Sequence, residues 1–199
     1  PVGTPVGTVH VVVPDSFDDP SRPSGGNTYD RRVCLGLEAL GWSVRVHALA
    51  GRWPHPDAGS LAALAGELGA LPQDGLVLVD GLVASATPDV VVPETRRLRV
   101  AVLVHLPLGH PLAGEAAGDD RGSVRSSPAG RERAVLESAA AVLTTSRWTR
   151  DWLADRYDLS PGRLHVAPPG ADRATAATGT PTGAALLSVA AAVLAMTGA

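Results

Sequence analysis

The sequence predicts an α/β fold, a doubly wound and mostly parallel sheet with helices on both faces. Short runs of Val and Leu alternate with helical apolar stripes along the chain, which is the order of elements in such folds. The runs are continuously apolar, as in strands that are buried on both faces. The chain of 199 residues, 45% of them hydrophobic, is long enough to bury such a core.

In the first half of the chain, strands and helices are expected to alternate. The expected elements are the strand Val9–Val13, a loop from Asp15 to Gly26, a helix whose apolar stripe runs from Val33 to Leu40, the strand Val44–Ala48, and a helix with a stripe from Leu61 to Leu68. Gly41 is expected to end the first helix and Ser60 to cap the second.

The second half is expected to add four strands, which are Leu76–Val79, Val100–Val104, Ala141–Thr144 and Leu164–Val166. Pro88 and Pro93 interrupt the segment between the first two of these strands. The stretch from Gly109 to Gly130 has little apolar periodicity, so we expect a mobile loop there. Two helices should lie between the later strands, one from about Arg131 to Ala139 and one capped by Ser146.

Composition excludes several classes of protein and site. The formal net charge of −3 and the lack of a basic run argue against a nucleic-acid-binding protein. The single cysteine, Cys34, excludes a disulfide framework, and its place on an apolar stripe predicts a core position. No His, Asp or Glu cluster has metal-ligand spacing, so no metal is expected. No apolar run reaches the roughly 20 residues of a membrane span, and residues 1–10 lack signal-peptide features, so we expect a cytoplasmic protein.

The loop after the first strand ends in Gly25, Gly26 and Asn27 and opens a helix. Glycine lets the backbone approach a ligand closely, and the first amides of a helix carry partial positive charge. One interpretation is therefore a site for a diphosphate, and the other is a tight loop in which the glycines serve only the turn. The pattern is not G-x-G-x-x-G, and a phosphate-binding P-loop needs a lysine, which the sequence does not contain.

Three more polar residues follow apolar strands, at the edge of the sheet where ligands bind in such folds. His105 could hydrogen-bond a substrate hydroxyl or phosphate, or could only cap the end of its strand. Asp80 could contact an acceptor or serve as a turn residue before glycine. Ser146 could meet a ligand, but a role as N-cap explains it and is favoured.

Four segments of the chain share their order and spacing with a known family. They read VVVPDSFDDPSRPSGGNTYDRR with a helix that ends in LEALGWSVRVHAL, then VAVLVHLPLGH, then ERAVLESAAAVLTTSRWTRDWLADRY, and finally RLHVAPPGAD. Together they resemble the N-terminal half of a GT-B fold glycosyltransferase of the family 4 type, over roughly residues 8–172.

The resemblance implies an enzyme that transfers a sugar, such as a hexose, from a nucleotide-sugar donor to an acceptor. It implies retention at the anomeric carbon and no metal or other cofactor. This domain would mainly hold the acceptor, while backbone amides of the Gly25–Gly26 loop would stabilise the departing donor diphosphate. The site residues that it implies are His105 as the catalytic residue near the reacting sugar, and Gly25, Gly26, Asn27, Tyr29, Asp80 and Ser146 as substrate-binding residues.

We expect residues 1–172 to form the Rossmann-like domain and residues 173–199 to form a linker with a C-terminal strand or helix. The donor-binding half of the family, with its basic pair and Glu-x7-Glu motif, does not occur in this chain, so transfer by this polypeptide alone is not expected. The alternative is a stand-alone, non-catalytic module that binds a sugar or nucleotide, and another Rossmann-like enzyme is a third possibility. A reading frame that continues past Ala199 into a second α/β domain would favour the transferase, and a stop codon there would favour the module.

Overall fold

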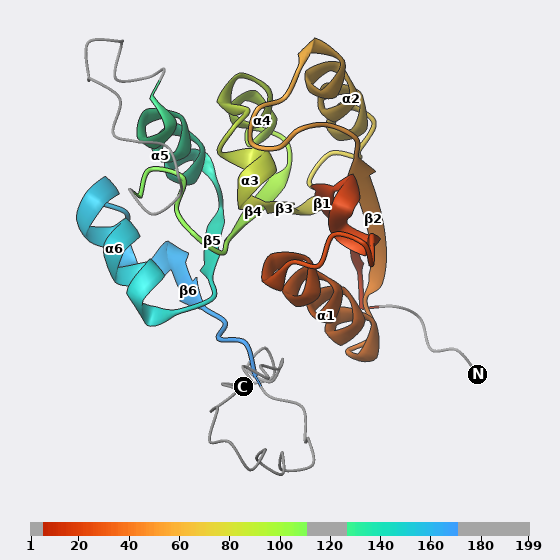
Figure 1. The fold of residues 1–199 in the computed structure, drawn as a ribbon, viewed down its shortest axis with the longest axis horizontal. Helices are drawn as coiled ribbons and strands as arrows, with labels where there is room; N and C mark the ends of the chain where they lie inside the picture. The colour runs from red at the N-terminus through yellow and green to blue at the C-terminus, as the bar shows by residue number, and fades with distance from the viewer. Residues whose placement is uncertain (1–5, 111–126, 171–199) are drawn as a thin grey trace, which may run out of the picture.

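The computed structural model describes residues 6–110 and 127–170, which fold around a six-stranded sheet (Figure 1). The strands are β1 (Thr8–Pro14), β2 (Ser43–Leu49), β3 (Leu76–Asp80), β4 (Arg99–Val104), β5 (Ala141–Thr144) and β6 (Leu164–Val166). Every neighbouring pair is parallel, and the order across the sheet is β2-β1-β3-β4-β5-β6. All six predicted strands are confirmed, and the order of the strands reverses between β1 and β3.

Helices cover both faces of this sheet, as predicted. They are α1 (Gly25–Ala39), α2 (Ala58–Gly69), α3 (Gly81–Ala84), α4 (Pro88–Glu94), α5 (Pro128–Ser138) and α6 (Arg147–Tyr157), with the short 3-10 helices η1 (Asp15–Asp18) and η3 (Pro161–Arg163). Because successive side chains of a strand point to opposite faces, Val11 packs with Val33 and Cys34 of α1. Val12 instead belongs to the larger core cluster, which includes buried residues of α2, α4 and α5. No helix within the described ranges is long and apolar enough to cross a membrane.

Helix α1 begins at Gly25, which confirms that the glycine pair opens the helix, although its apolar stripe starts only at Val33. Part of the expected loop before it forms the short helix η1. Its end agrees with the prediction, since Gly41 follows the helix with a φ of 86°, a left-handed conformation that glycine adopts without strain. The buried position of Cys34 is also confirmed.

Two predicted helix starts were wrong. The N-cap of α2 is Asp57, not Ser60, because the Asp57 carboxylate accepts a hydrogen bond of 2.8 Å from the Ser60 amide. Helix α5 begins at Pro128, behind Ser127 as N-cap, rather than at Arg131. A proline fits the first turn of a helix, where its missing amide has no partner to lose. The predicted loop therefore ends before Gly130, and most of that loop lies outside the described residues.

The segment between β3 and β4 is helical, which the sequence did not indicate. Pro88 and Pro93 were interpreted as interruptions, yet Pro88 occupies the first turn of α4 and Pro93 its last turn. Neither position breaks the helix, since a seven-residue helix has few internal hydrogen bonds to lose. The linker and terminal element expected over residues 173–199 lie outside the described residues.

Candidate functional site

The candidate site lies at the carboxyl edge of the sheet, where β1, β3 and β4 end. Ligands of open parallel sheets bind at this edge, close to the point where the strand order reverses. The chain after β1 leads into α1, β3 ends at Asp80, and His105 follows β4 directly. Three features that the sequence predicted separately, the glycine pair, Asp80 and His105, are thus brought to one edge.

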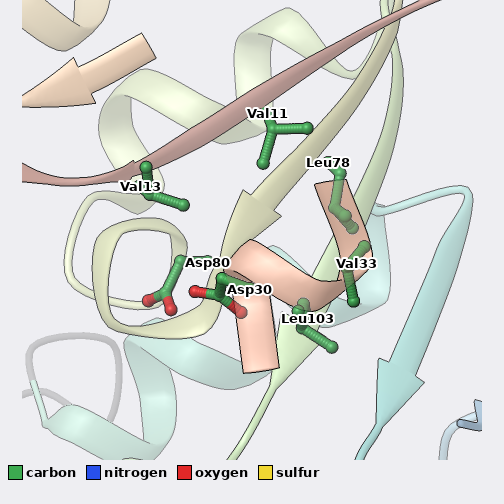
Figure 2. Close-up of a pocket in the computed structure, with 7 residues that line it drawn as sticks. All are labelled: Val11, Val13, Asp30, Val33, Leu78, Asp80 and Leu103. Atoms are coloured by element: carbon green, nitrogen blue, oxygen red, sulfur yellow. The ribbon is translucent and has the colours of Figure 1, made fainter. Parts of the chain in front are cut away.

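His105 lies beside two buried carboxyl groups. Its Nε2 is 2.8 Å from Oδ1 of Asp30, on α1, and 3.6 Å from Oδ2 of Asp80. The side chains of Asp30 and Asp80 are only 3% and 5% exposed, and the two carboxyl groups are close enough for Asp30 to raise the pKa of Asp80. Figure 2 shows them next to each other, at the end of a narrow crevice that valine and leucine side chains of the sheet and α1 also line.

The charges in this cluster are balanced by protons. Burial lowers the pKa of His105, but the hydrogen bond to Asp30 and the charges of Asp30 and Asp80 outweigh burial and raise it. Burial, and then the charge of Asp30, raise the pKa of Asp80 to about 7, against the opposing effects of His105 and the Leu82 amide. Two carboxylates this close do not both ionise easily in a buried site. The cluster therefore favours a protonated Asp80 and a positively charged His105.

The first turn of α1 approaches the same imidazole. A Cβ placed on Gly26 would lie 3.3 Å from Cδ2 of His105, whereas a Cβ on Gly25 would meet no heavy atom within 4 Å. The N-cap residue Ser24 makes no side-chain capping hydrogen bond, while α2, α5 and α6 each have a capping side chain that accepts from a backbone amide. The amides at the start of α1 are therefore not capped by a side chain, and such amides can bind an anion.

Asn27 and Tyr29 join α1 to neighbouring parts of the chain. Nδ2 of Asn27 donates to the Ser16 carbonyl oxygen at 2.7 Å, and the Tyr29 hydroxyl donates to the Ala167 carbonyl oxygen at 2.6 Å. The Tyr29 ring stands edge-on to the His105 ring, with centroids 5.3 Å apart. Burial, and next the charge of Asp30, raise the pKa of Tyr29 to about 12, so its hydroxyl keeps its proton. Contact of either residue with a substrate stays a prediction.

Ser146 and Asp80 have the structural roles that the sequence allowed. Ser146 caps α6, its hydroxyl oxygen accepting from the Thr149 amide at 3.0 Å, which confirms the favoured interpretation. Asp80 caps α3 through the Leu82 amide at 2.6 Å, so it is a turn residue and a partner of His105 at once. Whether Ser146 and Asp80 also bind substrate stays a prediction.

Asp30 is the member of the cluster that sequence reasoning missed. It lies within a helix beside Arg31, where a charged residue is usually in contact with solvent. The one available signal was its spacing from Gly26, since residues four apart share a face of a helix. Its partner His105 is 75 positions away in the sequence, so spacing along the chain could not reveal the pair.

The cluster is also the one group among the described residues that has the donors to hold a metal ion. One ligand-type atom from each of Asp30, Asp80 and His105 lies within 4.8 Å of the others, which their spacing in the sequence did not show. These atoms already contact one another directly, and the adjoining crevice is too narrow for a water molecule.

Comparison with known families agrees with this architecture. The family described as Glycosyltransferase Family 4 matches residues 23–175, which run from the residues before α1 to beyond β6. A comparison with curated proteins returned no match. Since the family match covers most of the chain, this protein belongs to glycosyltransferase family 4.

Proposed function

We propose that this chain is the acceptor-side domain of a retaining glycosyltransferase, which transfers a sugar from a nucleotide-sugar donor to an acceptor. Membership of the family supports sugar transfer. The observation that carries the proposal is the start of α1, a glycine pair without a side-chain cap, set against His105 at the reversal point of the sheet. Sugar donors of this class carry a diphosphate, which is the kind of anion that such a helix start binds.

The residues at this edge supply positive charge where the reaction needs it. Departure of a nucleoside diphosphate builds negative charge on its phosphate oxygens, and fixed donors that face this charge stabilise the transition state. The amides at the start of α1 carry the partial positive charge of the helix, and His105 favours its charged form beside Asp30. No lysine is available for this task, since the sequence contains none.

We further propose that transfer requires a donor-binding half that this chain does not contain. No two glutamates of the sequence have the Glu-x7-Glu spacing of the family that the chain resembles.

A screen of nucleotide sugars tests both proposals, the transfer of a sugar and the need for a donor-binding half. Binding is measured by ligand-detected NMR on this chain, and turnover is measured on this chain and on any longer protein that the reading frame encodes. Binding without turnover in the longer protein would indicate a non-catalytic module instead.

The adjacent glycines provide a matched pair of variants for the site. Gly26→Ala adds a methyl group 3.3 Å from the imidazole, whereas Gly25→Ala adds one in open space. We expect Gly26→Ala to weaken nucleotide-sugar binding about tenfold and Gly25→Ala to weaken it much less, because only the first displaces His105. Equal effects of the two substitutions, or failure of every nucleotide sugar to bind the unchanged chain, would argue against the proposed site.

His105→Ala tests the catalytic assignment. In a form of the protein that turns over, we expect a strong loss of turnover, at least about a hundredfold, with the circular dichroism spectrum unchanged. His105 belongs to neither core cluster, so we expect its removal to lower stability, because Asp30 loses a partner, while the secondary structure persists. Unchanged turnover would exclude a catalytic role for His105.

A further inference from the structure

We propose that Asp30 is a positioning residue, which holds His105 so that Nδ1 of the imidazole, rather than Nε2, faces the ligand. The orientation of the ring follows from contacts within this chain. Only the identity of the ligand, a nucleotide sugar, rests on the proposed function.

One face of α1 holds one edge of the imidazole. Asp30 Oδ1 lies 2.8 Å from Nε2, and the Cβ position of Gly26 lies 3.3 Å from Cδ2 and 3.5 Å from Nε2. Gly26 and Asp30 are four residues apart, so they lie on the same side of the helix. The edge formed by Nε2 and Cδ2 therefore lies against α1. Since Nδ1 is the ring atom opposite this edge, it points away from the helix.

Other elements hold the ring in the same orientation. Asp80, at the end of β3, also lies on the Nε2 side of the ring, and its Oδ2 is 3.6 Å from Nε2. Tyr29 packs edge-on against the imidazole, and the Thr145 hydroxyl donates to the His105 carbonyl oxygen at 3.4 Å. Both carboxyl groups thus contact Nε2, from α1 and from β3, and contacts with the ring and the backbone limit its rotation.

This orientation decides what His105 can offer to a ligand. When Nε2 donates its proton to Asp30, a neutral imidazole presents the lone pair of Nδ1, which accepts a hydrogen bond from a sugar hydroxyl. When the ring is protonated, Nδ1–H donates to an anion such as a phosphate oxygen. Asp30 is 3% exposed and does not need to touch the ligand, since it acts by fixing the tautomer and the angle of the ring.

The orientation is testable on this chain without any ligand. Nitrogen-15 NMR of the imidazole, recorded above the midpoint of its titration, distinguishes the two neutral tautomers, and we expect Nε2–H in the unchanged chain. In Asp30→Ala the preference should be lost and the midpoint of the His105 titration should fall by about one pH unit or more, because a nearby negative charge is removed. Glu38→Gln, at an exposed position of α1, is the matched control and should change neither property.

Three results would overturn the assignment. They are an Nδ1–H tautomer in the unchanged chain, no difference between Asp30→Ala and the unchanged chain, and stoichiometric perturbation of the ring signals by added Zn²⁺ that Asp30→Ala abolishes. The last result would assign the cluster to a metal ion. Should Asp30→Ala fail to fold, Asp30→Asn replaces it, since the amide oxygen can still accept from Nε2–H. The tautomer should then persist while the titration midpoint falls.

A second pair of variants tests which nitrogen faces the ligand. The side-chain amide of asparagine lies near the position of Nδ1, and that of glutamine near the position of Nε2. We expect His105→Asn to keep affinity for a nucleotide sugar within about threefold, and His105→Gln to lose about tenfold or more. The reverse order would overturn the proposal. Failure of the unchanged chain to bind any nucleotide sugar would count against the proposed function, while the tautomer measurement would still decide the role of Asp30.

Discussion

Among the residues that the structure describes, three acidic side chains, Asp30, Asp80 and Glu132, are almost completely buried. A buried carboxylate is costly unless hydrogen bonds or opposite charges compensate it. Asp30 and Asp80 are compensated by His105 and by each other. Glu132 is compensated by three donors at 2.8 to 3.0 Å, which are the Leu108 and Gly109 amides and the Tyr157 hydroxyl. Each of these acids fixes a part of the chain close to the candidate site.

Glu132 is expected to anchor the loop that follows His105. Burial raises the pKa of Glu132, while the hydrogen bonds that its carboxylate accepts oppose that rise. Glu132→Gln replaces an acceptor oxygen by an amide group that faces an N–H donor, so we expect the free energy of unfolding to fall by about 2 kcal/mol in urea titrations. Glu137→Gln, which removes an exposed pair with Arg133 on the same helix, should cost less than about 1 kcal/mol. Similar losses in both variants would contradict the anchoring role.

The residues of the site differ in how far the sequence revealed them. His105, Asp80 and Ser146 were predicted because each stands at or just after the end of an apolar strand, where the edge of a parallel sheet must lie. Asp30 and Glu132 were missed, since each lies within a helix and its polar partners come from distant segments. In a sequence, an exposed acidic residue of a helix cannot be distinguished from a buried one. The distinction requires knowing which strands pack against that helix.

Helix α1 shows, for a whole element, the same limit of prediction from sequence. Its apolar stripe begins near Val33 because the buried apolar residues of the helix, Val33 and Cys34, lie in its later turns. The first turns instead face the site and carry Gly26, Asn27, Tyr29 and Asp30. Apolar periodicity therefore located the half of α1 that stabilises the fold, and it missed the half that forms the candidate site.

Tyr29 is expected to tie α1 to the chain that leaves β6. Tyr29→Phe removes the hydrogen bond to the Ala167 carbonyl oxygen, so we expect a loss of about 1 kcal/mol in the free energy of unfolding. Hydrogen exchange at the Ala167 amide, which bonds to Thr144, should become faster. Tyr157→Phe removes a hydroxyl that bonds to Glu132 instead, so it should leave exchange at Ala167 unchanged. Unaltered hydrogen exchange at Ala167 in Tyr29→Phe would show that the Tyr29 hydroxyl does not hold this segment to α1.

At the scale of the whole molecule, the sheet brings together charges from three distant parts of the chain. The continuously apolar runs predict parallel strands, but they do not predict that the strand order reverses between β1 and β3. That reversal is what sets α1 and the ends of β3 and β4 around one site. The proton balance of Asp30, Asp80 and His105 thus exists only in the folded chain, and protonation must be linked to folding.

This linkage predicts that stability falls as the pH rises through neutrality. The pKa of Asp80 is about 7 in the folded protein against an ordinary value of 3.8, and that of His105 lies above 6.5. Between the unfolded and folded values the folded protein binds more protons, so rising pH favours unfolding. We expect the free energy of unfolding to drop by about 1–3 kcal/mol between about pH 5 and pH 8.

Two variants test this prediction. Asp80→Asn cannot lose this proton and still accepts from the Leu82 amide, so its free energy of unfolding should fall less over this pH range. Glu38→Gln should follow the unchanged chain. Stability that rises over this range, or an equal decline in Asp80→Asn, would mean that Asp80 does not hold the proton.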